Sequence, residues 1–231
     1  RFHQFKIHPK TQSILKKIIK NKELEVVASE RVWHEISVGL LENKSHIMFD
    51  VLHECGALKV LIPEINYVKN KTHIKRSLEY ANKLKYSEDL KAASFFMYLY
   101  SSNGSAKDIE KIYSRLSVPS SVRKLTEKLA HNLTELRQFK KLKPRQILDL
   151  IYKMDLFRNP DVLIDVINLL NAYNQGQTAK QKSAGSTSKV LQKYLKHLNK
   201  LNLGLISQNR TNVDIKTSIY EERLSVLKKL I

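Results

Sequence analysis

The sequence predicts an all-α protein, in which a larger multi-helix part is followed by a smaller helical tail. Apolar residues recur at spacings of three and four through most of the chain, which is the pattern of one helix face. No alternation of apolar and polar residues, as a half-buried strand requires, lasts for more than a few residues. The 231 residues include only 6 glycines and 5 prolines, too few to favour a fold built on many tight turns.

Start and stop signals divide this pattern into separate helices. A first helix follows Pro9 and Thr11, Ser29 is expected to cap a helix that reaches about residue 43, and Ser45 is expected to cap the next one. Gly56 closes that helix as the glycine after its last turn. Further helices are expected at about 72–86, 87–101, 105–116, 119–138, 144–155 and 159–173, with Pro119, Pro144 and Pro160 in first-turn positions.

One segment, residues 174–188, contains no large apolar side chain. This composition predicts a flexible loop between the larger part and the tail. Two helices are expected in the tail, at about 187–203 and 217–231.

The charge of the chain is strongly positive. Its 41 lysines and arginines exceed its 22 aspartates and glutamates, which gives a formal net charge of +19. Such a charge indicates a polyanionic partner, either nucleic acid or an anionic membrane surface. No stretch approaches the ~20 apolar residues of a membrane span, and no signal peptide is recognised. We expect no membrane partner. A single cysteine excludes a disulfide framework and fits a cytoplasmic location.

The predicted helix at 187–203 has two distinct faces. Four lysines fall within roughly 60° of one another at ~100° per residue, and leucines occupy the opposite side. No acidic residue occurs between Val166 and Val213, so pairing within the helix does not explain the lysines. We call these four residues, which are expected to bind RNA phosphates, the lysine stripe: Lys189, Lys193, Lys196 and Lys200. The alternative interpretation is an ordinary solvated helix face.

Six further basic residues are candidates for phosphate contacts. Two of them, Lys180 and Lys182, lie in the predicted loop before the stripe. The others surround the turn before Pro144, where they either rim the same site or belong to a soluble loop: Arg137, Lys140, Lys141 and Arg145.

Residues with catalytic or metal-binding patterns are missing. No His-Asp dipeptide occurs, and no two histidines lie three or four residues apart, as a metal-binding helix needs. Trp33 lies among core-type residues of a helix and is expected to pack rather than to stack on bases. We therefore expect neither a catalytic nor a metal site in this chain.

Two stretches carry a recognisable pattern, Glu30-Arg31-Val32-Trp33-x-Glu35 and Phe49-x-x-Leu52-x-x-Cys55-Gly56-Ala57-Leu58-x-x-Leu61-x-Pro63-Glu64-Ile65. This pattern resembles the neck and body of the bacterial class II tRNA nucleotidyltransferases, the CCA-adding enzymes, particularly the gamma-proteobacterial type. The final Glu221-Glu222-Arg223-Leu224-x-x-Leu227 is similar to the tail helix of that family. Residues 96–101 stand roughly where gamma-proteobacterial relatives often have a His-Asp phosphohydrolase motif, and they lack it.

The resemblance implies part of the neck at 1–27, a helical body at 28–173, a loop at 174–188 and a helical tail at 189–231. It also implies that the chain grips the phosphates of the tRNA acceptor stem and T arm. An N-terminal catalytic head, absent from this sequence, would add CCA to the tRNA 3′ end with Mg²⁺, CTP and ATP. On this interpretation the present chain is inactive alone and needs no cofactor of its own.

Three alternatives stay open at this point. The first is a poly(A) polymerase-like protein of the same superfamily, which would bind single-stranded RNA. The second is a basic helical interaction scaffold, whose charge reflects only compositional drift. The third is a phosphohydrolase, which the missing His-Asp motif disfavours.

Overall fold

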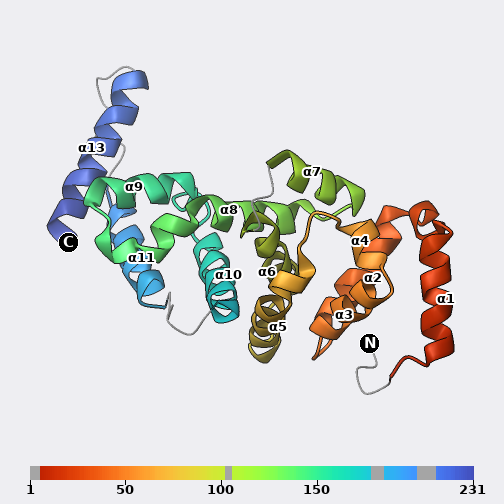
Figure 1. Cartoon of the computed structure of the whole chain (residues 1–231). Helices are drawn as coiled ribbons and strands as arrows, with labels where there is room; N and C mark the ends of the chain where they lie inside the picture. Colours follow the sequence, from red (N-terminus) through yellow and green to blue (C-terminus); the bar gives the residue numbers. More distant parts are fainter. Residues whose placement is uncertain (1–5, 102–105, 178–184, 202–211) are drawn as a thin grey trace. The chain divides into compact units, whose positions relative to one another are not determined.

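The computed structural model describes residues 6–101, 106–177, 185–201 and 212–231 (Figure 1). Within these ranges every regular element is a helix and no strand occurs, so the all-α prediction is confirmed. In the same ranges no helix is both long and apolar enough to cross a membrane.

The chain folds as two compact units, each described here by itself. Unit 1 contains residues 1–130 and 168–182, and unit 2 contains residues 131–167 and 183–231. Helices α8 and α10 each contribute residues to both units. This division follows packing, and the family-based division into neck, body and tail stays an expectation.

The described helices of unit 1 follow the chain with short connections. They are α1 (Pro9–Lys20), the 3₁₀ turn η1 (Glu23–Val26), α2 (Ser29–Leu41), α3 (His46–Glu54), α4 (Ala57–Leu61), α5 (Tyr67–Lys83), α6 (Glu88–Ser101), α7 (Ala106–Arg115) and the first part of α8 (Ser120–Arg137). The other elements are the 3₁₀ turn η2 (Phe139–Lys141), α9 (Pro144–Lys153), α10 (Val162–Gly176), α11 (Gly185–Leu198) and α13 (Asn212–Leu230).

Several helix ends differ from the sequence prediction. Ser29 is the first residue of α2 rather than its cap, and its hydroxyl lies 2.6 Å from that of Ser117. Ser45 stands at the cap position of α3, but its side chain makes no capping bond. Helix α5 begins at Tyr67 instead of residue 72, because the Asn66 side chain accepts a hydrogen bond from the Lys69 amide. Gly56 has φ +89° directly after the last turn of α3, as predicted.

Helix α10 also departs from the prediction. It starts at Val162, after Pro160, and it continues to Gly176, inside the segment that was expected to be a loop. The extension has a tertiary cause: the carbonyl oxygen of Gly176 is hydrogen-bonded to Nδ1 of His73 on α5. Tyr98 on α6 stacks on the ring of His73, and its hydroxyl donates a hydrogen bond to the His73 carbonyl oxygen at 3.1 Å.

The core of unit 1 is built around α6. This helix packs against α5 and α2, and in Figure 1 it runs beside α5. Consecutive residues Phe95 to Leu99 are all at most 2% exposed, so α6 is buried on every side there. Phe95 stacks on Phe49 of α3 with ring centroids 4.0 Å apart, and Trp33 of α2 stacks on Phe96. The prediction that Trp33 packs in the core is confirmed.

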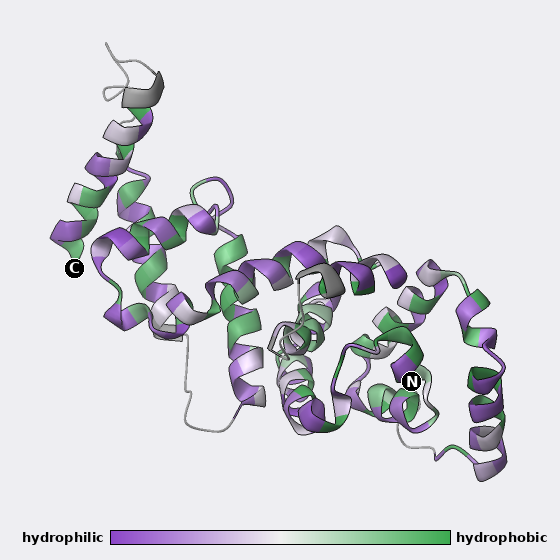
Figure 2. Ribbon diagram, turned by 45° about the horizontal axis from the view of Figure 1, so that its top comes forward, coloured by the Kyte–Doolittle hydropathy of each residue, from purple (hydrophilic) through white to green (hydrophobic). Residues whose placement is uncertain are grey.

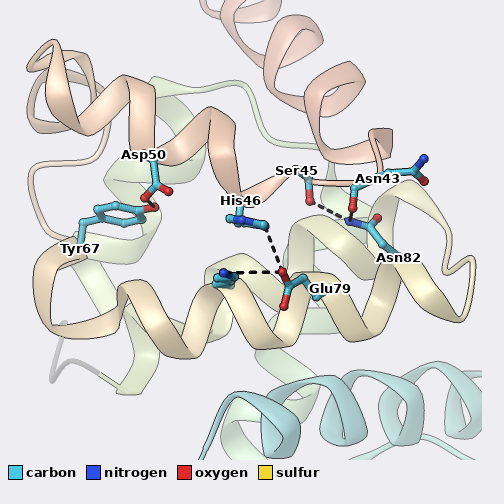
Figure 3. A network of polar contacts seen from close by, with 8 residues as sticks. Asn43, Ser45, His46, Asp50, Tyr67, Glu79 and Asn82 are labelled. Carbon is cyan, nitrogen blue, oxygen red and sulfur yellow. Dashed lines mark hydrogen bonds and ion pairs between the residues drawn. The ribbon is translucent and has the colours of Figure 1, made fainter. Parts of the chain in front are cut away.

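Polar contacts join α3 to α5 at one side of this core (Figure 3). The Tyr67 hydroxyl donates to Asp50 at 2.7 Å, and Asn82 donates to the hydroxyl of Ser45 at 3.0 Å. Between them lies His46, a buried histidine whose Nδ1 is 3.8 Å from a carboxylate oxygen of Glu79. Burial lowers the pKa of His46 below its ordinary value.

We predict that Gly176→Ala destabilises the fold, although alanine is the better helix former. A Cβ at this position would lie 2.6 Å from the His73 carbonyl oxygen and would overlap the Tyr98 hydroxyl. Overpacking of this kind costs about 1–3 kcal/mol, more than the ~0.5–1 kcal/mol that replacing a helical glycine gains. Thermal unfolding followed by circular dichroism should show a lower Tm, whereas Gln175→Ala on the exposed neighbour should leave it unchanged. A Tm equal to or above that of the parent chain contradicts the prediction.

We predict that His46 makes the chain less stable in mild acid. Because its pKa is lowered in the folded state, the unfolded chain binds more protons once the pH falls below about 6.5. The groups facing it are Glu79 and Asp50, which favour the charged form, and Lys75 and Lys44, which oppose it. The contribution that neutral His46 makes to the stability of the fold is therefore fully present above pH 6.5 and is lost as the pH falls below it.

The measurement is urea unfolding at pH 7.5 and pH 5.0. His46→Gln should lose less stability between the two values than the parent chain, because one titrating group has been removed. The control is His34→Gln, which changes an exposed histidine of the same unit and should behave like the parent. If His46→Gln loses as much stability as the parent, the buried histidine is not the cause.

Candidate nucleic-acid interface

Helix α11 separates its apolar and basic residues as the sequence predicts. Its buried face consists of side chains that are at most 8% exposed: Leu191, Tyr194, Leu195 and Leu198. All four residues of the lysine stripe are exposed. The helix ends at Leu198, earlier than expected, so that Lys200 lies in the turn that follows.

The lysine stripe has no acidic partner in the described parts of the chain. No Asp or Glu oxygen there lies within 4.0 Å of these four ammonium groups. The apolar face beneath them packs against α13. Three exposed lysines on α11 and Lys200 in the turn after it form a surface that can contact successive phosphates, and such contacts carry affinity without base identity.

The second basic cluster lies on the connection between α8 and α9, in the same unit. Arg137 ends α8, and Lys140 and Lys141 belong to η2; all three side chains are exposed. Pro144 occupies the first turn of α9, as predicted, and the Gln146 side chain accepts a hydrogen bond from the Lys143 amide at 2.9 Å. Three cations thus project from a short, well-capped corner.

Arg145 differs from its neighbours because it connects two helices. Its guanidinium lies 3.4 Å from Glu221 and 5.9 Å from the ring centroid of Tyr220, both on α13. Tyr220 in turn donates a hydrogen bond to Asp149 of α9 at 2.6 Å. Arg145 therefore contributes to the packing of α13 on α9, and its exposed ion pair adds little stability.

Arg223 anchors α13 more deeply. It is 8% exposed, its guanidinium carbon lies 3.6 Å from the ring centroid of Phe157, and it donates a 2.7 Å hydrogen bond to the Tyr152 hydroxyl. In Figure 2 the described part of α13, the helix that ends at the C mark, carries hydrophilic and hydrophobic residues side by side. Aromatic packing of this cation holds α13 on α9, and α13 in turn covers the apolar face of α11.

The structure describes the positions of most, but not all, of the predicted phosphate-binding residues. The lysine stripe, Arg137, Lys140 and Lys141 are exposed in unit 2, and Arg145 is engaged with α13. Lys180 and Lys182 lie outside the described residues. Among the residues that the structure does describe, no three His, Cys, Asp or Glu side chains gather as a metal site would need.

Helix α1 is a basic surface that the sequence prediction did not select. None of its residues is buried, and it packs mainly on η1. Exposed lysines lie along it and beside it: Lys6, Lys10, Lys16, Lys17, Lys20 and Lys22. Their spacing is less regular than that of the lysine stripe, which is why periodicity did not single them out.

One protein family matches the N-terminal part of the chain. Residues 4–69 match the family described as "Probable RNA and SrmB-binding site of polymerase A". The match contains α1 to α4 and the start of α5, so it falls entirely in unit 1. It lies outside the helices that carry the lysine stripe and the second basic cluster.

Curated relatives match between three quarters and all of the chain. A "Multifunctional CCA protein" of Methylobacillus flagellatus is 22% identical over 99% of this chain and 62% of its own length. The protein of the same name from Paraburkholderia phymatum is 24% identical over the whole chain and 62% of its own length. That of Acinetobacter baylyi is 28% identical over 75% of the chain and 48% of its own length.

The chain therefore spans between about half and about three fifths of the length of these relatives. Among solved structures, none matches it significantly. The match to the RNA-binding family of polymerase A and the relatives that cover the chain agree with the resemblance carried by residues 30–65. Over most of its length the chain is similar to the bacterial multifunctional CCA proteins, and its N-terminal part is similar to the RNA-binding region of polymerase A.

Proposed function

We propose that this chain is a tRNA-binding portion of a CCA-adding enzyme, and that the lysine stripe holds tRNA by its phosphates. The observation that carries the proposal is the geometry of α11 and the turn after it, with the four exposed lysines of the stripe and, on the opposite side of the helix, a buried leucine face. The absence of an acidic partner within the described residues supports it, because no carboxylate there competes with a phosphate for these ammonium groups. Arg137, Lys140 and Lys141 extend the basic surface of the same unit.

The match of residues 4–69 to an RNA-binding family supports RNA as the partner. The printed name of the relatives supports CCA addition as the activity of the whole protein. We place that chemistry, with Mg²⁺, CTP and ATP, in the catalytic head that the resemblance implies. No step of it is assigned to the described residues, since they gather no cluster of metal-ligand side chains. The acceptor stem and T arm are the proposed contact region, and the cytoplasm is the proposed location.

A salt titration tests the role of the stripe. We predict that changing Lys189, Lys193, Lys196 and Lys200 together to alanine weakens tRNA binding and flattens its salt dependence. Each phosphate contact contributes about 0.9 to the slope of log K against log salt on a duplex, so four lost contacts lower the slope by about 3–4. The measurement is fluorescence anisotropy with a labelled tRNA, titrated with salt and with a DNA duplex of matched charge as competitor.

A charge-matched control separates a site from generic attraction. Changing Lys83, Lys124, Lys216 and Lys229 to alanine removes the same charge from exposed positions outside the stripe. This control should keep most of the slope. Equal losses in the two variants, or equal competition by tRNA and DNA, would show that the +19 charge acts only as a diffuse attraction.

A poly(A) polymerase-like role is the second candidate, and the printed name of the matched family favours it. Such a protein would bind unpaired RNA. Direct competition between an acceptor-stem hairpin and oligo(A) distinguishes the two functions: preference for the hairpin supports the tRNA role, and preference for oligo(A) supports the alternative.

A further inference from the structure

A pocket of about 390 Å³ opens between the end of α3, helix α4 and the start of α5, all within unit 1. Its lining includes His53, Lys59, Pro63, Asn66, Tyr67 and Val68, over a floor of buried apolar side chains. The volume falls within the range of small-molecule sites in proteins. None of the four lysines of the stripe lines this pocket.

The pocket is held in shape from two sides. On one side, Arg115 of α7 makes two hydrogen bonds to the Glu64 carboxylate, at 2.9 and 3.1 Å, and a third to the Leu61 carbonyl oxygen. On the other side, the Tyr67 hydroxyl donates to Asp50 (Figure 3), and burial together with this bond raises the pKa of Tyr67. The connection from α4 to α5 is therefore fixed before any ligand arrives.

The side chains around the pocket suit a nucleotide. The exposed imidazole of His53 packs against the buried ring of Tyr67, with centroids 5.2 Å apart and the rings tilted by 43°. His53 is therefore the ring that can stack on a base, beside apolar Pro63 and Val68. Unpaired bases stack on such rings. Asn66 uses its side-chain oxygen to cap α5, which leaves its amide nitrogen as a donor toward a base.

The charge of the pocket favours an anion. Lys59 is exposed and makes no ion pair with the described residues, whereas the Glu64 carboxylate is occupied by Arg115. The lining residues, 53 to 68, all fall within the segment that matches the RNA-binding family. An exposed ring for a base and an unpaired ammonium group for a phosphate thus occur together in the segment that matches the RNA-binding family.

We propose that this pocket binds one unpaired nucleotide of an RNA, with the base against His53 and the phosphate beside Lys59. The proposal rests on the proposed function in that it takes RNA as the partner. It goes further in assigning a second contact, made by unit 1, that recognises a base as well as a phosphate. The lysine stripe contacts phosphates alone.

Amide NMR of the ¹⁵N-labelled chain tests the proposal, with adenosine and cytidine 5′-monophosphates as probes and inorganic phosphate for comparison. The nucleotides should shift amides within residues 53–68 and bind at least tenfold more tightly than inorganic phosphate. His53→Ala and Lys59→Ala should each weaken nucleotide binding about tenfold, because base stacking is worth ~1–3 kcal/mol and a phosphate contact is lost. Both side chains are exposed, so neither change should lower the Tm.

The matched controls are His34→Ala and Lys44→Ala, which alter an exposed histidine and an exposed lysine of unit 1 outside the pocket. They should bind nucleotides like the parent. The proposal is overturned if inorganic phosphate binds as tightly as the nucleotides, if the shifts fall on α11 instead, or if the pocket variants bind nucleotides normally.

A parallel tRNA titration keeps this inference separate from the proposed function. If tRNA binding depends on the lysine stripe but nucleotides leave residues 53–68 unshifted, only the pocket is refuted. If nucleotides bind in the pocket but tRNA and DNA compete equally, the pocket stands and the tRNA function falls.

Discussion

The burial of α6 on all its sides is the constraint on which unit 1 depends. A helix that is apolar all around must be surrounded by other helices, and α2, α3 and α5 supply the rings and aliphatic side chains that cover it. Its polar atoms must then find partners inside. Tyr98 does so through the His73 carbonyl oxygen, and Ser94 bonds to the Leu90 carbonyl oxygen at 2.7 Å. The end of α10 is fixed at the same place. The Gly176 carbonyl oxygen is hydrogen-bonded to His73, and Tyr98 and His73 leave no room for a side chain at Gly176.

A second constraint concerns how the acidic residues are used. Many of them are occupied by structural pairs, and the strongest of these use arginine: Arg115 with Glu64, and Arg123 with both Glu110 and Glu127. Arginine suits this task because its planar group binds a carboxylate through two bonds. Because these carboxylates are paired with arginines, they do not neutralise exposed lysines such as those of the stripe. The sequence holds 31 lysines and 10 arginines, so most of the positive charge remains of this kind.

Much of the helical arrangement could be predicted from local pattern, while the ends and the pocket could not. The leucine face of α11, the packing of Trp33 and the positive φ of Gly56 follow from spacing and residue type alone. The apolar periodicity predicts the start of α5 five residues too late, because it does not show that Asn66 caps the helix. The extension of α10 depends on His73, about a hundred residues earlier in the chain, which no local pattern can show. The pocket depends in the same way on Arg115, which is 51 residues from Glu64.

The two proposed contacts differ in how they respond to salt, and this difference explains why a basic protein would need both. Phosphate contacts by the lysine stripe release counterions, so they weaken steeply as salt rises and do not distinguish one sequence from another. A base held against His53 is stabilised by stacking, which depends far less on ionic strength and requires an unpaired nucleotide. At low salt the stripe dominates and any polyanion competes. Near physiological salt the base contact contributes a larger share of the affinity, and discrimination between an RNA with an accessible base and a plain duplex rises accordingly.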